Sequence, residues 1–370
     1  MEATISEPRK EKIAILGGGM GSIAAAFENE QAHDAYDTVF FQKGNVNVIE
    51  KTPDVDFKIF MAMTALLMIP AAITLQTVDV TREFVVVDNP TPLGYTWSLL
   101  TFILPVSALG WWFLRHEEYN VEKKAFWFTI AFFTGAGLIL DIGLGHTFFT
   151  FPNSGATLGI HLPGFDFKQG GFVWDVPIEE FGFYFFGSLF MLLFYIWADL
   201  FWFGAYNVDY ESETKLVAKL VRPHYASAIW GVGLVIAAIV YKKFGSHPYN
   251  EGFPGYFTIL VIGYVAPTFV FFRTVKPFVN WRALSLTLYS MWLISLFWEV
   301  TLGLPYQWWG YNPEQMIGIF IDGWTNLPIE ETLLWSVAGW GTTMTYEITR
   351  VYWYMNKPYR EALFGPPEPS

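Results

Sequence analysis

Two pairs of adjacent glutamates stand at the start of long apolar segments. The stretches Asn326–Glu331 and Asp175–Glu180 both end in Pro-Ile-Glu-Glu, and an apolar run follows each. Carboxyl groups are common donors and acceptors of protons in catalysis. We expect these pairs to supply acid–base chemistry to an apolar substrate inside a membrane, which makes catalytic candidates of Glu179, Glu180, Glu330 and Glu331.

A purely structural interpretation of the same residues has equal weight for any single glutamate. Pro177 and Pro328 suit the first turn of a helix, where the missing N–H of proline needs no partner. A carboxylate in that turn complements the helix dipole. Adjacent residues point about 100° apart around a helix. At most one glutamate of each pair can therefore face the centre of a bundle, and the other can cap its helix.

Two further acids favour the catalytic interpretation. Asp141 and Glu299 lie inside otherwise apolar segments, where an ionisable group costs roughly 2.5–3.5 kcal/mol and is usually functional. The chain leads from each of them through a loop to a glutamate pair, so we expect all six acids at one membrane level. Carboxyl groups that cluster in an apolar medium disfavour one another's ionisation. We therefore expect a neutral carboxyl, able to donate a proton, beside an ionised one that can accept it.

Aromatic and amide side chains crowd the same loops. Aromatic residues make up 19% of the chain, an excess that suits a pocket for a flat or cationic hydrocarbon. Our candidates for substrate binding are Phe151, Asn153, Trp174, Trp298, Trp309, Tyr311, Asn312 and Trp324.

Other chemistries find little support. The chain has no cysteine, and His146 and His161 lack the spacing of metal ligands on a helix. It has no Asp-rich cluster for magnesium and a diphosphate, and no lysine deep in an apolar segment. The net charge of −12 argues against nucleic acid as a partner. We expect neither a metal nor a cofactor.

The elements that position these residues are membrane helices. Of 370 residues, 53% are hydrophobic and 15% charged, below the roughly 25% charged of soluble proteins. Several apolar blocks reach the roughly 20 residues that cross a bilayer. We predict an all-α polytopic bundle of eight spans: Phe57–Val78, Leu93–Leu114, Ala125–Phe149, Pro177–Phe203, His224–Tyr241, Pro254–Phe272, Ala283–Leu302 and Pro328–Tyr354.

The two halves of the membrane region repeat one plan. Asp141–Gly145 matches Glu299–Gly303, and Leu158-Gly159-Ile160 matches Ile317-Gly318-Ile319. We predict a four-plus-four duplication with halves of equal orientation. The halves are residues 54–206 and 224–356, with a cytoplasmic linker at 207–223 and a tail at 357–370. Lysine and arginine gather in alternate loops and at both flanks, which predicts a multi-pass protein of the cell membrane with cytoplasmic termini.

Residues 1–53 have a different character. Lys12–Leu16 reads as a strand that enters a Gly-rich turn, and Asp37–Gln42 reads as a second strand, as in a short α/β dinucleotide-binding fragment. Ser22 stands in place of the third glycine, and the remaining strands are missing. A fragment of this size cannot bury a core. We expect a soluble segment that is not a cofactor site.

The motifs resemble those of the membrane-integral lycopene cyclases, the heterodimeric or fused type of actinobacteria, archaea and fungi. The stretch Trp309–Ile319 followed by Pro-Ile-Glu-Glu is most similar, and the first half matches through Phe151-Pro152-Asn153 and its own Pro-Ile-Glu-Glu. The similarity covers residues 125–203 and 283–354. The long loop Gly164–Trp174 and the N-terminal fragment depart from the family and leave the exact substrate open.

This resemblance implies a non-redox isomerisation. An acid protonates a terminal alkene of lycopene, a carbocation closes a six-membered ring, and a base removes a proton. The glutamates of both pairs would be the acid and the base. The implied partners are a lipophilic carotenoid or terpenoid, the lipid bilayer and another enzyme of the carotenoid pathway.

Three other functions remain open. A proton-coupled transporter would use the same acids to bind cations or relay protons. A carotenoid hydratase would add water to the same kind of cation. A scaffold subunit would dock a soluble flavin enzyme through the N-terminal fragment.

Overall fold

The computed structural model describes residues 92–116 and 121–366, with the strands β1 (Glu11–Ala14) and β2 (Tyr36–Val39) and the single positions 58, 61, 62 and 65. β1 and β2 pair in parallel. The Gly-rich turn, including Ser22, and most of the predicted span Phe57–Val78 lie outside the described residues.

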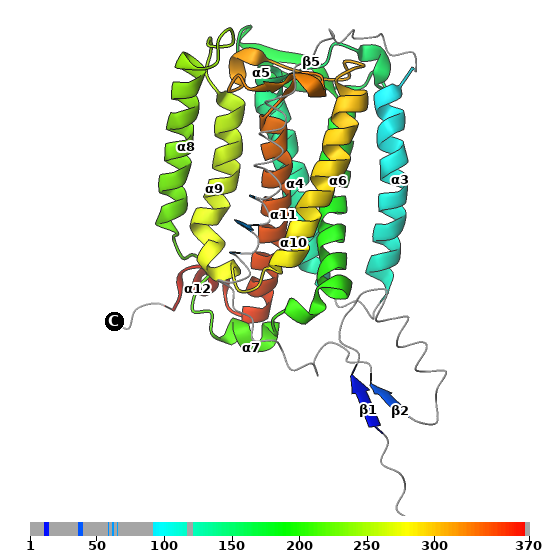
Figure 1. Cartoon of the computed structure of the whole chain (residues 1–370), viewed down its shortest axis with the longest axis vertical. Helices are drawn as coiled ribbons and strands as arrows, with labels where there is room; N and C mark the ends of the chain where they lie inside the picture. Colours follow the sequence, from blue (N-terminus) through cyan, green and yellow to red (C-terminus); the bar gives the residue numbers. More distant parts are fainter. Residues whose placement is uncertain are drawn as a thin grey trace, which may run out of the picture.

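Long helices form a bundle (Figure 1). Six of them are long and apolar enough to cross a membrane, and their bounds lie within a few residues of the predicted spans. The helices are α3 (Gly94–Arg115), α4 (Lys123–Leu140), α6 (Glu179–Trp197), α8 (Tyr225–Phe244), α9 (Gly255–Val275) and α10 (Trp281–Trp298). Three of these helices continue past the bounds given. α4 continues through η1 (Asp141–Gly145) and α5 (His146–Phe148). α6 continues through η3 (Ala198–Trp202), and α10 continues through η5 (Glu299–Gly303).

The seventh long helix, α11 (Glu330–Met355), occupies the middle of the bundle and packs against α4, α6, α9 and α10. It is more polar than the other six, and it is not among those apolar enough to cross a membrane by composition. Its central place explains this, because its side chains meet other helices and not lipid, so buried threonines such as Thr342 and Thr343 are tolerated.

Short strands cap one end of the bundle, so the all-α prediction is incomplete. The segment expected as a loop, residues 150–176, contains an antiparallel hairpin of β4 (His161–Asp166) and β5 (Gly171–Pro177). Two smaller pairs accompany it, β3 (Phe149–Thr150) with β6 (Gly310–Tyr311) and β7 (Phe320–Ile321) with β8 (Leu327–Pro328). In Figure 1 the hairpin lies beside α5 at the top.

The opposite end is closed by the linker and the tail. The linker forms the short helix α7 (Tyr210–Lys215), which packs against α11. Leu220 and Val221 donate backbone hydrogen bonds to the carbonyls of Ala362 and Leu363 in α12 (Tyr359–Phe364). The linker is therefore part of the bundle end and not a free connection.

The same succession of elements occurs twice along the described chain. A helix ends in a π-helical turn, η1 or η5, that begins with an acid. A short strand, a 3₁₀ turn (Ser154–Ala156 or Pro313–Gln315) and a pair of strands follow. The next helix, α6 or α11, then opens with two glutamates. Single π-helical turns in a helix occur frequently at functional sites.

Candidate functional site

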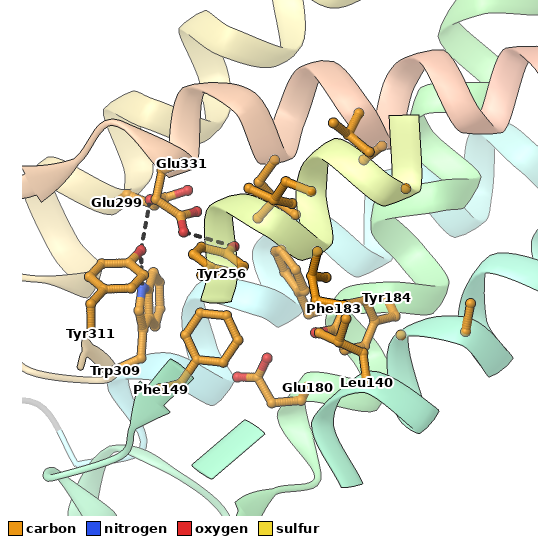
Figure 2. Close-up of a pocket in the computed structure, with 18 of the residues that line it drawn as sticks. Leu140, Phe149, Glu180, Phe183, Tyr184, Tyr256, Glu299, Trp309, Tyr311 and Glu331 are labelled. Atoms are coloured by element: carbon orange, nitrogen blue, oxygen red, sulfur yellow. Dashed lines mark hydrogen bonds between the residues drawn. The ribbon is translucent and has the colours of Figure 1, made fainter. Parts of the chain in front are cut away.

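A half-enclosed cavity of about 240 Å³ lies inside the bundle near the end that the short strands cap. Figure 2 shows the side chains that line it. Helices α4, α6, α9, α10 and α11 contribute to its wall, together with Tyr95 of α3. Apart from three carboxyl groups, those of Glu180, Glu299 and Glu331, its lining is aromatic or aliphatic. An apolar pocket with a few convergent polar groups is the usual form of a binding site.

The second glutamate of each pair faces this cavity. Glu180 accepts a hydrogen bond of 2.7 Å from the Tyr95 hydroxyl, and Glu331 accepts one of 3.0 Å from the Tyr256 hydroxyl. Both tyrosines follow a glycine at the head of a helix, Gly94 in α3 and Gly255 in α9. Each carboxyl therefore meets a phenol from a helix distant in the sequence.

The first glutamate of each pair is turned away and does not line the cavity. Glu179 accepts a hydrogen bond of 2.7 Å from the backbone N–H of Leu158, and Glu330 accepts one of 2.5 Å from that of Ile317. Both side chains are buried. The roughly 100° between neighbouring helix positions separates the members of each pair. Glu179 and Glu330 hold the preceding loops, which is the structural role that the sequence leaves open for one glutamate of each pair.

The acids that begin the π-helical turns η1 and η5 are held in similar ways. The Tyr184 hydroxyl donates to Asp141 at 2.9 Å, and the Trp335 indole N–H donates to Glu299 at 2.7 Å. Tyr184 and Trp335 each stand four residues after the cavity-facing glutamate of their helix. Residues four apart share one helix face, so each donor points toward the same side as that glutamate.

The two halves differ in what reaches the cavity. Glu299 lines it beside Glu331 (Figure 2). Asp141 is 1% exposed and is not among the lining residues, although its neighbours Leu140 and Tyr184 are. Asp141 adjoins the cavity through Tyr184, which lines the cavity and donates a hydrogen bond to the Asp141 carboxyl. Two adjacent acids in the cavity come from the second half, and a single one, Glu180, from the first.

Tyr311 completes the acid pair of the second half. Its hydroxyl donates to Glu299 at 3.2 Å and accepts a hydrogen bond of 3.1 Å from the Trp309 indole. Burial and the neighbouring carboxylates of Glu299 and Glu331 raise the pKa of Tyr311 well above its ordinary value. The phenol therefore remains a neutral donor at neutral pH.

The predicted aromatic and amide residues divide into two groups. Phe151, Trp298, Trp309 and Tyr311 line the cavity. The other four do not line it. Trp174 is 68% exposed on β5, and Trp324 lies in the turn Asp322–Trp324 outside the cavity. The side-chain amides of Asn153 and Asn312 donate hydrogen bonds to backbone carbonyls.

The two asparagines instead join the halves. Asn153 donates to the carbonyl oxygen of Tyr306 at 2.9 Å, and Asn312 donates to that of Thr147 at 3.2 Å. Tyr306 stands six positions before Asn312, and Thr147 stands six positions before Asn153, so each asparagine binds the equivalent residue of the other half. The contact is therefore reciprocal.

Sequence reasoning missed four residues that complete the site: Tyr95, Tyr184, Tyr256 and Trp335. The Gly-Tyr pairs at the heads of α3 and α9, and the spacing of four residues after the second glutamate, were the available signals. Neither is specific by itself, because tyrosine and tryptophan are frequent in this chain and an indole or phenol near a helix end usually marks a membrane interface.

Among the residues that the structure describes, no group of three or more His, Asp or Glu is arranged to hold a metal ion. His146 pairs with Asp175 of β5 beside the first π-helical turn. His161 lies in β4, in the same hairpin.

No family model matches the chain, and neither a curated protein nor a solved structure matches it.

Proposed function

We propose that this protein is a membrane isomerase that closes a ring at the end of lycopene or a similar linear isoprenoid by proton transfer. The observation that carries the proposal is the adjacent pair Glu299 and Glu331 in a half-enclosed aromatic cavity (Figure 2). Two carboxyls so close in an apolar medium cannot both ionise easily, so one keeps a proton for donation.

The reaction is balanced within the substrate and the cavity acids. The neutral carboxyl of Glu331 gives its proton to a terminal carbon–carbon double bond, which leaves a tertiary carbocation. A neighbouring double bond of the chain attacks this cation, and the new carbon–carbon bond closes a six-membered ring. The Glu180 carboxylate, which lies on the other side of the cavity in Figure 2, removes a proton. The product has the mass of the substrate.

The aromatic wall suits the cationic intermediate. The rings of Phe183, Trp298 and Trp309 line the cavity, and the centroid of Trp298 lies 6.1 Å from that of Phe183 and 4.9 Å from that of Trp309. The face of an aromatic ring attracts a cation by roughly 0.5–2 kcal/mol. Few water molecules can enter such a lining, which favours loss of a proton over capture of water and so cyclisation over hydration.

We further infer a four-plus-four duplication with eight spans, the first of them at residues 57–78, and cytoplasmic termini in the cell membrane. The reciprocal asparagines and the two π-helical turns support the duplication. The same duplication accounts for the equivalent Gly-Tyr pairs. On this proposal the partners are the isoprenoid, the bilayer and another enzyme of the carotenoid pathway.

The test is expression in a bacterium that accumulates lycopene. We expect the wild-type chain to convert the pigment to cyclic products of unchanged mass. Glu331→Gln should abolish the conversion, and Glu314→Gln, which changes an exposed acid of the capping loops, should not. An unchanged pigment with a membrane-inserted wild-type chain would reject the proposal, and a product heavier by one water would identify a hydratase.

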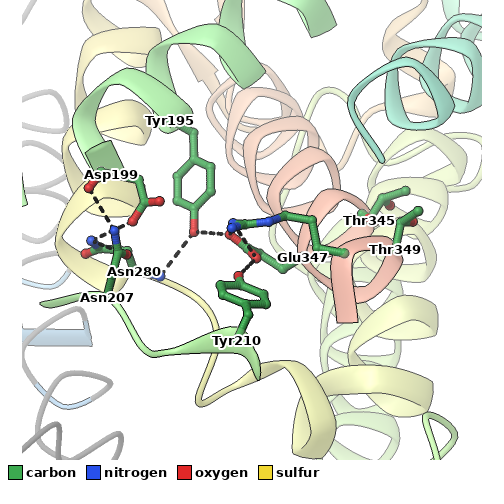
Figure 3. A network of polar contacts seen from close by, with 9 residues as sticks. Tyr195, Asp199, Asn207, Tyr210, Asn280, Thr345, Glu347 and Thr349 are labelled. Carbon is green, nitrogen blue, oxygen red and sulfur yellow. Dashed lines mark hydrogen bonds and ion pairs between the residues drawn. The ribbon is translucent and has the colours of Figure 1, made fainter. Parts of the chain in front are cut away.

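A proton-coupled transporter is the second candidate. The observation that favours it is a buried acid at the opposite end of α11 (Figure 3): Glu347 accepts hydrogen bonds from the Tyr195 and Tyr210 hydroxyls and pairs with Arg350 at 3.3 Å. Acids at both ends of one central helix suit a proton path. Acid-dependent flux across vesicles that contain the purified protein would support this function, and its absence would remove it.

A further inference from the structure

The cavity extends away from the acids between two helices that do not pack on each other. Phe133, Ala136 and Leu140 of α4 form one side, and Ile259 and Gly263 of α9 form the other. The floor is α11, through Leu334, Val337 and Ala338. α11 packs against both α4 and α9, whereas α4 and α9 share at most a marginal contact.

Small residues keep this gap open at its middle. Ala136 and Gly263 are both exposed at the protein surface although they lie within apolar helices. A Cβ atom on Gly263 would come within 3.3 Å of Val337, so the backbone of α9 lies directly against the floor at this point. Val337 is six positions after Glu331, about 9 Å along the helix axis.

The cavity as a whole, with the gap included, is too small to enclose a long isoprenoid. Its volume of about 240 Å³ is below the roughly 300–1,000 Å³ of pockets that enclose a drug-sized ligand. It accommodates an end group alone. The remainder of a long molecule must leave through the gap, and a gap that opens among lipid-facing positions of two spans leads into the hydrocarbon layer.

We propose that the gap between α4 and α9 is a binding site for an extended hydrocarbon chain and opens sideways into the bilayer. One end of the molecule reaches the acids, and its tail lies over Leu334 and Val337 and continues among the lipids. This inference rests on the proposed function for the identity of the end group. It implies that a substrate with two reactive ends is processed at one end, released, and bound again at the other.

The site can be tested by photolabelling without any assay of activity. The probe is a long-chain alkane that carries a diazirine at one end, added to the protein in lipid nanodiscs. We expect labelled peptides from residues 332–341 of α11. Gly263→Trp should lower this labelling about tenfold, the factor that corresponds to about 1.4 kcal/mol of lost binding.

Gly233→Trp is the matched control. Gly233 is also an exposed glycine in an apolar helix, α8, but it does not line the cavity and has nothing near its Cβ position. It should leave the labelling unchanged. Equal labelling of α11 in wild type and Gly263→Trp, or a loss of equal size in Gly233→Trp, would overturn the proposal.

A second variant avoids a folding defect. The chain has no cysteine, so Gly263→Cys can be purified folded and then blocked with a bulky maleimide, and the same sample is compared before and after the block. If the block removes α11 labelling but the wild type never cyclises lycopene, the site stands and the proposed function fails. If cyclisation continues at the wild-type rate after the block, the site fails and the acid chemistry stands.

Discussion

At the scale of single residues, the difference between neighbours in a glutamate pair decides their roles. Glu331 and Glu180 meet phenols at the cavity wall, whereas Glu330 and Glu179 accept backbone N–H groups of the capping loops. A buried N–H that loses its acceptor costs about 1–3 kcal/mol. Glu180 and Glu331, which face the cavity, should therefore control reactivity. Glu179 and Glu330 should control stability.

The first prediction separates these roles in the second half. Glu331→Gln should lower the rate of cyclisation by about 10²-fold or more, the usual contribution of an acid–base group, with little change in thermal stability. Glu330→Ala should lower the thermal unfolding midpoint, because the Ile317 N–H is left without its acceptor. Product formation and unfolding in detergent micelles measure the two effects. The reverse pattern would exchange the assigned roles.

The second prediction concerns pH. Burial and nearby carboxylates raise the pKa of Tyr311 in the folded state above its value of about 10 in an unfolded chain. The folded protein then holds this proton more tightly, so its contribution to stability is present below pH 10 and is lost as the pH rises toward the folded value. Tyr311→Phe should lose less stability than wild type between pH 9 and about 11. Parallel unfolding curves for both proteins would contradict this assignment.

At the scale of elements, the short strands and turns matter because they set the distance between the halves. Asn153 and Asn312 each hold a carbonyl of the other half, and β3 pairs with β6 across the same boundary. The hairpin of β4 and β5 lies next to the first π-helical turn, where His146 meets Asp175. The cavity acids on α6 and α11 keep their separation only if these contacts persist.

The third prediction tests the reciprocal asparagines. Asn312→Ala removes a donor to the Thr147 carbonyl and should destabilise the fold by about 0.5–1.5 kcal/mol. Because the capping strands loosen, cyclisation should fall by a similar free energy. Asn250→Ala, at an exposed position of a loop, should change neither property. Unfolding midpoints and initial rates of the wild type, Asn312→Ala and Asn250→Ala provide the measurement. Equal values for the two variants would contradict the inference that Asn312 holds the two halves together.

At the scale of the whole molecule, a polar helix at the centre organises the bundle. α11 carries the cavity acid at one end and, at the other, the buried pair of Glu347 and Arg350, which the linker contacts through Tyr210. Asp199 and Asn280 extend this network to α6 and α10 (Figure 3). The linker is thereby attached to the same helix that presents Glu331.

The fourth prediction follows from the low dielectric around that pair. Glu347→Ala leaves the guanidinium of Arg350 buried without its partner and should destabilise the protein by about 3–5 kcal/mol. The double variant Glu347→Met with Arg350→Met should recover much of this loss, because no buried charge remains. Thermal unfolding of the single and double variants measures the difference. A double variant as unstable as the single one would show that the charges are not what the network depends on.

The helices were within reach of sequence reasoning, and so was the division of each glutamate pair. Apolar length indicates a span, and Pro-Ile-Glu-Glu marks a first turn, because both signals are local. The observed starts of α6 and α11, at Glu179 and Glu330, follow the predicted ones by two residues. The angle between adjacent helix positions already required that one glutamate of each pair turn away from the centre.

The tertiary structure alone decided which partners those acids meet. Tyr95 lies 85 residues from Glu180 and Tyr256 lies 75 residues from Glu331, and no local pattern specifies contacts across such separations. It also placed Asp141 outside the cavity lining with a hydrogen bond from Tyr184, turned Trp174 outward, folded a hairpin in the expected loop and left a gap between α4 and α9. The physical reason is that hydropathy records how deeply a residue is buried, whereas its neighbours depend on how whole helices pack.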